Sequence, residues 1–442
     1  MQKLTWRQLA AVGSMLFGLF FGAGNLIFPM AMGQLAGRNL WAAAAGFLIT
    51  GVGLPLLGVA ALGLSRESGL LALSSRVGRG YGLAFTCALY LTIGPFFAIP
   101  RCATVSYTVG IAPLAPGGGA ALGVFSLAFF AVVLFFSLRP GQILTWVGKV
   151  LNPLFLAFLA VLVLRALAAP LGQAAAVEPA GAYRAAPFAT GLLEGYNTMD
   201  ALAGLAFGIL VVQAIRRLGV RAPGDVAVST VCAGVFSSAL MAGIYLLVTL
   251  VGAQSRGRFA AAANGGEALA QIAAAYFGRA GALILAATVT VACLKTAVGL
   301  ITSCGETFVE IFPHGPSYRV WAVGFCLLSF LIANLGLDAI LAWSQPVLMA
   351  LYPLAIVLIL LTLAGPLYGD DRAVLRGGLG CTAAAAVLEF LRALPAGAAP
   401  AVQPVVDWAA AWLPLYAKGF GWVLPAAVGC AAGLVVRARR SR

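Results

Sequence analysis

Two segments of this 442-residue chain place polar residues inside long apolar stretches. The first is Phe20-Phe-Gly-Ala-Gly-Asn-Leu-Ile-Phe-Pro29, where two glycines, an asparagine and a proline weaken a helix. Interrupted backbone inside a membrane is tolerated where it lines a cavity or is buried in protein. Its free N–H and C=O groups could bind a zwitterion and a cation; tight packing of small residues is the alternative. The candidate binding residues here are Gly22, Ala23, Gly24 and Asn25.

The second segment is Glu194-Gly-Tyr-Asn-Thr-Met-Asp-Ala-Leu-Ala-Gly204, which carries two carboxylates. A charge near the centre of a bilayer costs several kcal/mol unless it is paired or faces water, so Asp200 requires a partner. We expect Asn197, Thr198 and Asp200 to contact a substrate. Glu194 is either a gating residue or a residue that only marks the membrane interface.

Two basic residues also fall inside apolar stretches. Lys295 lies in Thr288-Val-Thr-Val-Ala-Cys-Leu-Lys-Thr-Ala-Val-Gly-Leu300, where snorkelling from mid-membrane exceeds the reach of one side chain. It either belongs to an ion or substrate site or pairs with a carboxylate to hold helices together. Arg101 follows Pro100, which frees a backbone carbonyl that a guanidinium can satisfy, so its role is either structural or gating.

The composition identifies the solvent of most of these segments as lipid. Apolar residues make up 62% of the chain and charged residues 9%, with a mean hydropathy of +1.01; soluble domains carry about 25% charged residues. The net charge of +14 does not indicate nucleic-acid binding, because the basic residues sit in short runs between apolar stretches. The eight cysteines form no C-x-x-C pair and there is one histidine, so we expect no disulfide, metal cluster or cofactor.

Stretches of about 20 apolar residues predict an all-α membrane protein with twelve spans. The run near the N-terminus is too long for the h-region of a signal peptide, so we read it as the first span. Of the 27 lysines and arginines, 17 fall on the side of both termini and 8 on the other, which predicts cytoplasmic termini. Two external loops are expected, an irregular one at 169–189 and one at 253–280 with a short helix over Glu267 to Phe277. The spans run roughly over 8–33, 40–64, 80–110, 119–138, 143–168, 190–214, 224–252, 281–305, 318–334, 339–363, 376–393 and 416–436.

The spacing of the two polar segments predicts an inverted repeat. Gly24 and Thr198 lie 174 residues apart, each in the first span of a five-span block. Interrupted helices at corresponding positions of two halves point to a binding site near the midplane of a transporter. We therefore divide a single membrane domain into one repeat at 8–168, a second at 190–363 and two further spans at 376–436, with spans one and six discontinuous.

Four stretches of the chain closely resemble the branched-chain amino acid:cation symporter family. They are the first polar segment, the part Glu194-Gly-Tyr-Asn-Thr-Met-Asp-Ala-Leu202 of the second, Ile99-Pro-Arg-Cys-Ala-Thr-Val-Ser106 and Gln345-Pro-Val-Leu-Met-Ala-Leu-Tyr-Pro353. The resemblance implies a LeuT-like inverted repeat of five helices and sodium-driven uptake of leucine, isoleucine and valine. It also implies the cytoplasmic membrane of a bacterium. Phe96, Phe97 and the aliphatic residues after Asp200 would form the apolar part of the substrate pocket.

One position departs from the family pattern. In LeuT-like sodium transporters, a cation beside span one is completed by a carbonyl and two hydroxyl residues of span eight. These positions fall here on Ala292, Lys295 and Thr296, opposite the carbonyls around Gly18 and Phe21. An ammonium group in place of Na⁺ would make uptake independent of sodium. Lys295 would then be a fixed charge or a carrier of H⁺.

Other classes fit the residues less well. An intramembrane enzyme needs a nucleophile–base pair or clustered carboxylates, and neither occurs in the sequence. A channel would need a filter motif. A carrier of another amino acid or an organic cation on the same fold is the closest alternative. The expected partners are a small-molecule amino-acid substrate and membrane lipid, and the oligomeric state stays open.

Overall fold

The computed structural model describes residues 4–22, 24–65, 67–113, 118–139, 152–395 and 397–440. Within these ranges the chain is helical and contains no strand. Seven helices there are long and apolar enough to cross a membrane, and one bent pair makes an eighth. The predicted all-α membrane fold is confirmed, whereas the count of twelve spans remains a prediction. Ala23, Lys3, Arg66, Lys149, Arg442 and the first part of the span expected at 143–168 lie outside the described residues.

Within the described residues, each predicted span coincides with one helix or with consecutive helical pieces. The helix predicted from Glu267 to Phe277 is confirmed as the first part of α14, which bends at Gly278 (φ 60°). The principal helices are α1 (Trp6–Phe20), α2 (Gly24–Ala36), α3 (Leu40–Leu48), α4 (Leu54–Ser65), α5 (Leu70–Ser75), α6 (Arg79–Leu91), α7 (Ala98–Ser106), α8 (Gly118–Ser137), α10 (Asn152–Ala168), α11 (Pro187–Glu194), α12 (Asp200–Arg217), α13 (Pro223–Ser255), α14 (Gly265–Ile311), α15 (Tyr318–Ala333), α16 (Leu337–Leu363), α17 (Gly365–Tyr368), α18 (Arg372–Arg392), α19 (Ala399–Trp412) and α20 (Val423–Arg440).

The third predicted span contains an irregularity that the sequence analysis did not predict. Between α6 and α7 a wide helical turn spans Thr92–Phe96, and Gly94 leaves the helical region with φ −102° and ψ −122°. Pro95 follows directly and supplies no N–H to the helix. The turn changes the direction in which the next side chains point.

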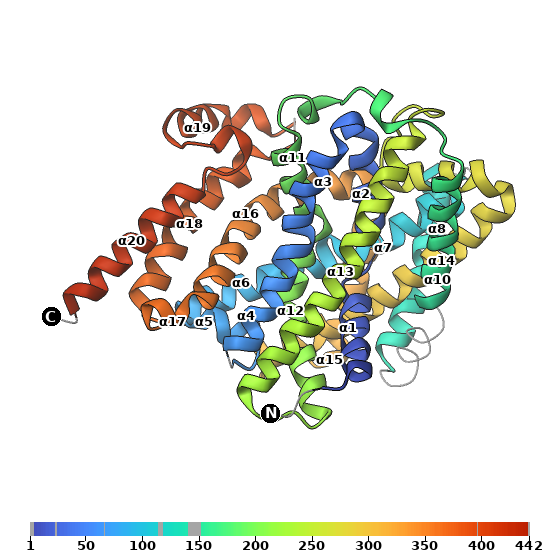
Figure 1. Ribbon diagram of the computed structural model, residues 1–442. Helices are drawn as coiled ribbons and strands as arrows, with labels where there is room; N and C mark the ends of the chain where they lie inside the picture. Colours follow the sequence, from blue (N-terminus) through green and yellow to red (C-terminus); the bar gives the residue numbers. More distant parts are fainter. Residues whose placement is uncertain are drawn as a thin grey trace.

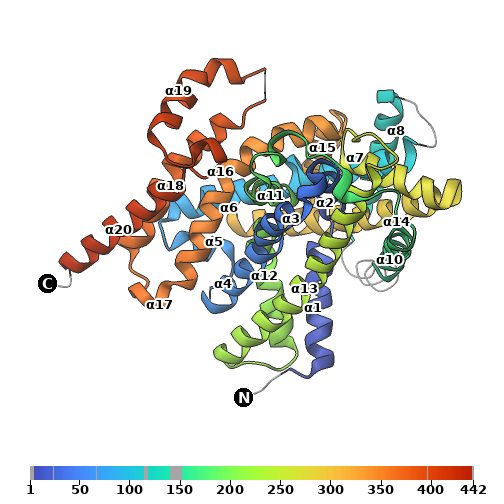
Figure 2. The ribbon, with the colours of Figure 1, turned by 45° about the horizontal axis from the view of Figure 1, so that its top comes forward.

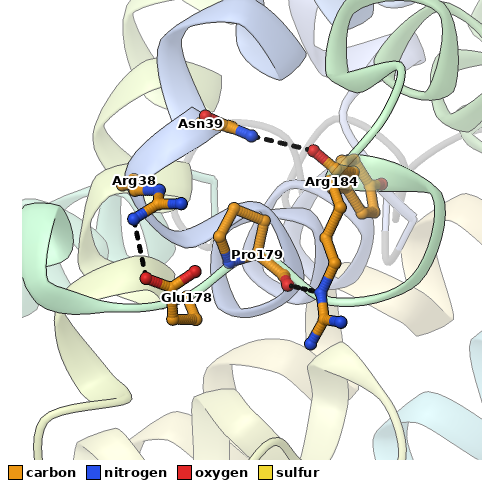
Figure 3. A network of polar contacts seen from close by, with 6 residues as sticks. Arg38, Asn39, Glu178, Pro179 and Arg184 are labelled. Carbon is orange, nitrogen blue, oxygen red and sulfur yellow. Dashed lines mark hydrogen bonds and ion pairs between the residues drawn. The ribbon is translucent and has the colours of Figure 1, made fainter.

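The irregular loop expected at 169–189 lies across the junction of α2 and α3 (Figure 3). At this junction Gly37 adopts a φ of 50°, and a Cβ there would lie 2.3 Å from the carbonyl oxygen of Val177. The Arg38 side chain forms an ion pair of 2.6 Å with Glu178. The amide of Asn39 donates to the carbonyl of Tyr183 at 2.9 Å. The loop therefore holds the end of α2 that lies farther from α1.

The helices that carry the polar segments pack closely against other helices. Helix α13 packs against both α1 and α2, while α12 packs against α4 and α14 packs against α7. In Figures 1 and 2, α18, α19 and α20 lie at one edge of the molecule, away from α1 and α2. The C-terminal helices are therefore not part of the polar interior.

Candidate binding site at two helix breaks

The first break follows α1. Phe21 takes an extended backbone conformation (φ −72°, ψ 98°), and helical structure resumes at Gly24. The Gly22 N–H donates to Oδ1 of Asn25 at 2.7 Å, and the Asn25 N–H donates to the carbonyl of Gly22 at 3.2 Å. The Asn25 side chain thus takes the N–H that would otherwise bond to the carbonyl of Gly18 in a continued helix. The Gly18 carbonyl is left to accept another donor.

The second break lies between α11 and α12, whose axes are bent by 45°. Residues Gly195–Thr198 form a tight 3-10 turn, and Met199 adopts the left-handed conformation with φ 63° and ψ 10°. The Thr198 hydroxyl donates to the carbonyl of Gly195 at 2.9 Å and accepts the N–H of Asp200 at 3.3 Å. Asp200 is therefore the first residue of α12, at the positive end of that helix.

A polar cluster joins the two breaks. Oδ2 of Asp200 accepts hydrogen bonds from Nδ2 of Asn25 and from the hydroxyl of Tyr245, each at 2.7 Å. The amide of Asn25 also contacts the Tyr245 hydroxyl directly. Asp200 is 2% exposed, and the ion pairs found within the described ranges do not include it. The required partners of this carboxylate are thus neutral donors, one from each of α2 and α13.

Tyr245 was not among the site residues predicted from the sequence. It lies in the middle of an apolar stretch of α13, where a tyrosine is compatible with an ordinary core position. The available signal was the requirement that a buried tyrosine hydroxyl finds a hydrogen-bond partner. That requirement does not identify which partner it finds.

A cavity of about 50 Å³ lies beside the polar cluster. Cavities in other proteins that take up a molecule as small as benzene have volumes of about 150 Å³, so this cavity must widen to admit an amino acid. One part of its wall is polar and comes from the breaks; the rest is apolar. The predicted residues among its lining are Gly22, Gly24, Asn25, Arg101, Thr198, Asp200 and Thr296, and the apolar lining includes Phe20, Ile93, Ala98, Ala203, Phe207 and Leu300.

Three predicted substrate contacts do not line this cavity. Phe96 is 38% exposed and, like Phe97, is absent from the wall. The irregular turn before α7 accounts for this, because it places Ile93 and Ala98 at the cavity instead. Asn197 lines a separate cavity.

The predicted cation region gathers at the end of α1. Nζ of Lys295 donates to the carbonyl of Gly18 at 3.0 Å. The Thr296 hydroxyl donates to the carbonyl of Ala292 at 3.1 Å and lies close to Gly22. Phe21 is buried and stacks on Phe17. An ammonium group therefore occupies the position beside the carbonyl that the first break leaves free.

Arg101 closes the other side of the cavity. Its guanidinium donates to the carbonyl of Asn197 at 2.8 Å and to the sulfur of Met199 at 3.1 Å. It also lies 5.1 Å from the centre of the Phe28 ring, at cation–π distance. The side chain is 3% exposed. Arg101 thus links α7 to the second break and to α2.

Beyond this wall lies a second cavity of about 240 Å³. Phe28 and Asn197 form the boundary between the two cavities, since each contacts Arg101 and lines the second cavity. Glu194, Asn264 and Gln345 contribute its polar groups. The two predicted gating residues, Arg101 and Glu194, therefore line different cavities on either side of one wall.

The family model described as "Branched-chain amino acid transport protein" matches residues 6–440. The branched-chain amino acid permease BrnQ of Lactobacillus delbrueckii subsp. lactis is 54% identical, over 97% of this chain and 96% of the relative. A permease of the same name from Bacillus subtilis (strain 168) is 40% identical, over 100% and 99%. The branched-chain amino acid transport system 2 carrier protein of Pseudomonas aeruginosa is 42% identical, over 98% and 97%.

Two solved structures share the fold. Mhp1, a nucleobase-cation-symport-1 family transporter in a closed conformation with bromovinylhydantoin bound, aligns with a TM-score of 0.62 at 14% identity. That likeness covers 98% of this chain and 92% of Mhp1. MhsT in complex with L-phenylalanine aligns with a TM-score of 0.55 at 15% identity, covering 100% and 99%. The predicted LeuT-like fold is confirmed by these likenesses.

Proposed function

The chain belongs to the branched-chain amino acid transport protein family, and from that premise we propose that it imports leucine, isoleucine and valine across a bacterial cytoplasmic membrane by symport. The observation that carries this proposal is the direct contact between Asn25 and Asp200, which brings the two helix breaks to one small cavity. Such breaks near the midplane are where transporters of this architecture bind their solutes.

The charges around the cavity suit a zwitterion. The N-terminal end of α2 at Gly24 and Asn25 presents backbone N–H groups and a positive dipole to a substrate carboxylate. Asp200 offers a negative charge to the substrate ammonium. Ile93, Phe207 and Leu300 supply apolar contacts for a branched alkyl chain. Because the alkyl chain has no polar group to recognise, the three substrates would differ by only about 1–3 kcal/mol per methylene.

Access to this cavity requires the wall at Arg101 to move. The cavity is too small for an amino acid while the guanidinium contacts Asn197 and Phe28. Separation of these groups would connect it to the larger cavity lined by Glu194. We assign Arg101 to the gate, with Glu194 as the nearest acidic group on the far side.

Lys295 argues for uptake without sodium. Its ammonium group lies 3.0 Å from the carbonyl of Gly18, where the family pattern places a cation between spans one and eight. With this position taken by a tethered charge, the proton becomes the expected coupling ion. Lys295 would be either a fixed charge or the proton carrier itself.

Proteoliposomes test the coupling ion. Uptake of labelled leucine is measured under a sodium gradient and a proton gradient applied separately, with isoleucine, valine, choline and a polyamine as unlabelled competitors. We expect the proton gradient alone to drive uptake and only the branched substrates to compete. A sodium requirement in the unmodified protein would rule out the role assigned to Lys295.

Two variants of the same position form a matched pair. Lys295→Thr supplies a hydroxyl at the cation position, so uptake should become dependent on sodium. Lys295→Met supplies neither a charge nor an oxygen, so uptake should respond to neither gradient. A Lys295→Thr protein that keeps the ion dependence of the unmodified chain would contradict the proposal.

The internal repeat remains part of the same proposal. We assign residues 8–168 and 190–363 to two inverted repeats, with 376–436 outside them and both termini in the cytoplasm. The breaks after α1 and after α11 occur at corresponding positions of these blocks, which supports the assignment. Fusion of a fluorescent reporter that folds only in the cytoplasm to the C-terminus tests the orientation: a dark fusion would overturn it.

A further inference from the structure

Helix α19 (Ala399–Trp412) divides into three faces of different chemistry. Val405, Trp408 and Trp412 are 42%, 59% and 73% exposed, and their spacing of three and four residues places them on one face. Gln403 and Asp407 lie on roughly the opposite side, where Nε2 of Gln403 donates to Oδ1 of Asp407 at 2.8 Å. The buried Ala409 lies between these two faces, and α19 packs on α18.

Hydrogen bonds of the segment that follows α19 fix the position of this helix near the end of α18. The Tyr416 hydroxyl donates to the carbonyl of Leu388 at 2.7 Å. The Gly421 N–H donates to Oε1 of Glu389 at 2.8 Å, and Arg392 pairs with the other carboxylate oxygen at 3.0 Å. These bonds tie the chain after α19 to the end of α18. Figures 1 and 2 show α19 lying across the ends of α18 and α20, on the side opposite to both termini.

We propose that α19 lies in the plane of the membrane interface and inserts Trp408 and Trp412 among the lipid headgroups and upper acyl chains. Tryptophan is enriched at this depth because its ring is apolar and its N–H is polar. Amphipathic helices lie in the interface with the apolar face toward lipid and the polar face toward water. Val387 of α18 and Leu424 of α20 are also exposed apolar side chains.

A second copy of the chain is a weaker fit for the same face. Fully buried aromatic side chains each cover about 150–250 Å², so two tryptophans and a valine fall short of the roughly 800 Å² per partner of a stable interface. The face also contains no charged residue that could set a register between two copies. Lipid requires neither the area nor the register.

Tryptophan fluorescence of the full chain in nanodiscs tests the proposal. The signal of Trp408 and Trp412 is obtained by subtracting the spectrum of the Trp408→Phe/Trp412→Phe variant from that of the unmodified chain. We expect lipids brominated close to the headgroup to remove most of this difference signal, and aqueous iodide to remove little of it. Gln403→Ala, on the opposite face, is the matched control and should leave the quenching unchanged.

Two results would overturn the proposal. In one, iodide quenches the difference signal and brominated lipid does not, which places the helix in water. In the other, neither quencher acts and the particle mass corresponds to two chains but falls to one in the variant, which assigns the face to a second copy. The single variants Trp408→Tyr and Trp412→Tyr allow the same subtraction if the double variant does not fold. No leucine uptake is measured, so the outcome is independent of the proposed transport function.

Discussion

Each of the two helix breaks is contacted by a basic side chain, a buried one at the second break and a half-buried one at the first, and the two side chains make different contacts. At the first break Lys295 donates to one carbonyl, that of Gly18. At the second break Arg101 holds the carbonyl of Asn197, the sulfur of Met199 and the face of Phe28. In both cases a donor from another helix replaces a backbone partner that the break removed.

The two contacts differ because Lys295 carries a compact ammonium group and Arg101 carries a planar guanidinium with several donors. An ammonium group is compact and can stand where a metal cation would be coordinated, whereas a guanidinium makes several directed contacts from one plane. The first break is therefore suited to hold a charge in place of an ion. The second break is suited to close a wall that must later separate. Asp200 connects the two, because it begins α12 and accepts the amide of Asn25.

The largest effect is expected where both breaks depend on one group. Asp200→Asn removes the negative charge from the cluster of Asn25, Asp200 and Tyr245. It also places a second amide in the cluster, next to that of Asn25. Loss of a buried partner costs about 1–3 kcal/mol, so initial leucine uptake should fall by roughly five- to 150-fold. Tyr245→Phe removes one of the two donors to Oδ2 of Asp200. The loss of uptake in this variant should be several-fold smaller than the loss in Asp200→Asn. An Asp200→Asn protein with uptake equal to that of the unmodified chain would show that the cluster does not join the breaks functionally.

The next largest effect is expected from packing, because the second break is packed more tightly than the first. A Cβ on Gly195 would lie 2.0 Å from the Thr50 hydroxyl and 3.0 Å from the backbone of Gly51, whereas a Cβ on Gly22 meets nothing closer than 3.4 Å. Overpacking costs about 1–3 kcal/mol, so Gly195→Ala should lower the midpoint of thermal unfolding clearly and Gly22→Ala only slightly. The double variant Gly195→Ala/Thr50→Ala should recover part of the loss. Equal midpoints for the two single variants would contradict the asymmetry.

The helix breaks, which depend on local sequence, could be predicted, whereas the contacts between different helices could not. The breaks follow from residues that disfavour helix within an apolar stretch, and the need of Asp200 for a partner follows from burial of a charge. The identity of that partner, Tyr245, depends on how α13 packs against α2 and α12. The turn at Gly94 was not predicted either. Pro95 alone did not indicate a change in side-chain direction large enough to keep Phe96 and Phe97 from the cavity.

Arg101→Lys tests whether the second break needs more than a charge. The lysine retains one donor for the carbonyl of Asn197 but loses the contacts with Met199 and Phe28. Loss of about one hydrogen bond, worth roughly 0.5–1.5 kcal/mol, should change the rate of leucine uptake by about two- to twelvefold. Stopped-flow or filter uptake at saturating leucine measures this rate. If Arg101→Lys takes up leucine at the rate of the unmodified chain, the second break needs only a positive charge and not the several donors of a guanidinium.

The smallest effect is expected for Phe96→Ala, and it locates the apolar part of the cavity. Phe96 precedes α7 and is 38% exposed, whereas Phe207 lies on α12 and lines the cavity. Phe96→Ala should therefore leave the KM for leucine within about twofold of its original value. Phe207→Ala should raise this KM by about five- to 150-fold, which corresponds to roughly 1–3 kcal/mol of lost apolar contact. Isoleucine and valine serve as additional substrates, because a wall residue changes their ranking and a distant residue does not. A larger change for Phe96→Ala than for Phe207→Ala would mean that the third span, and not the helix that begins at the second break, holds the alkyl chain of the substrate.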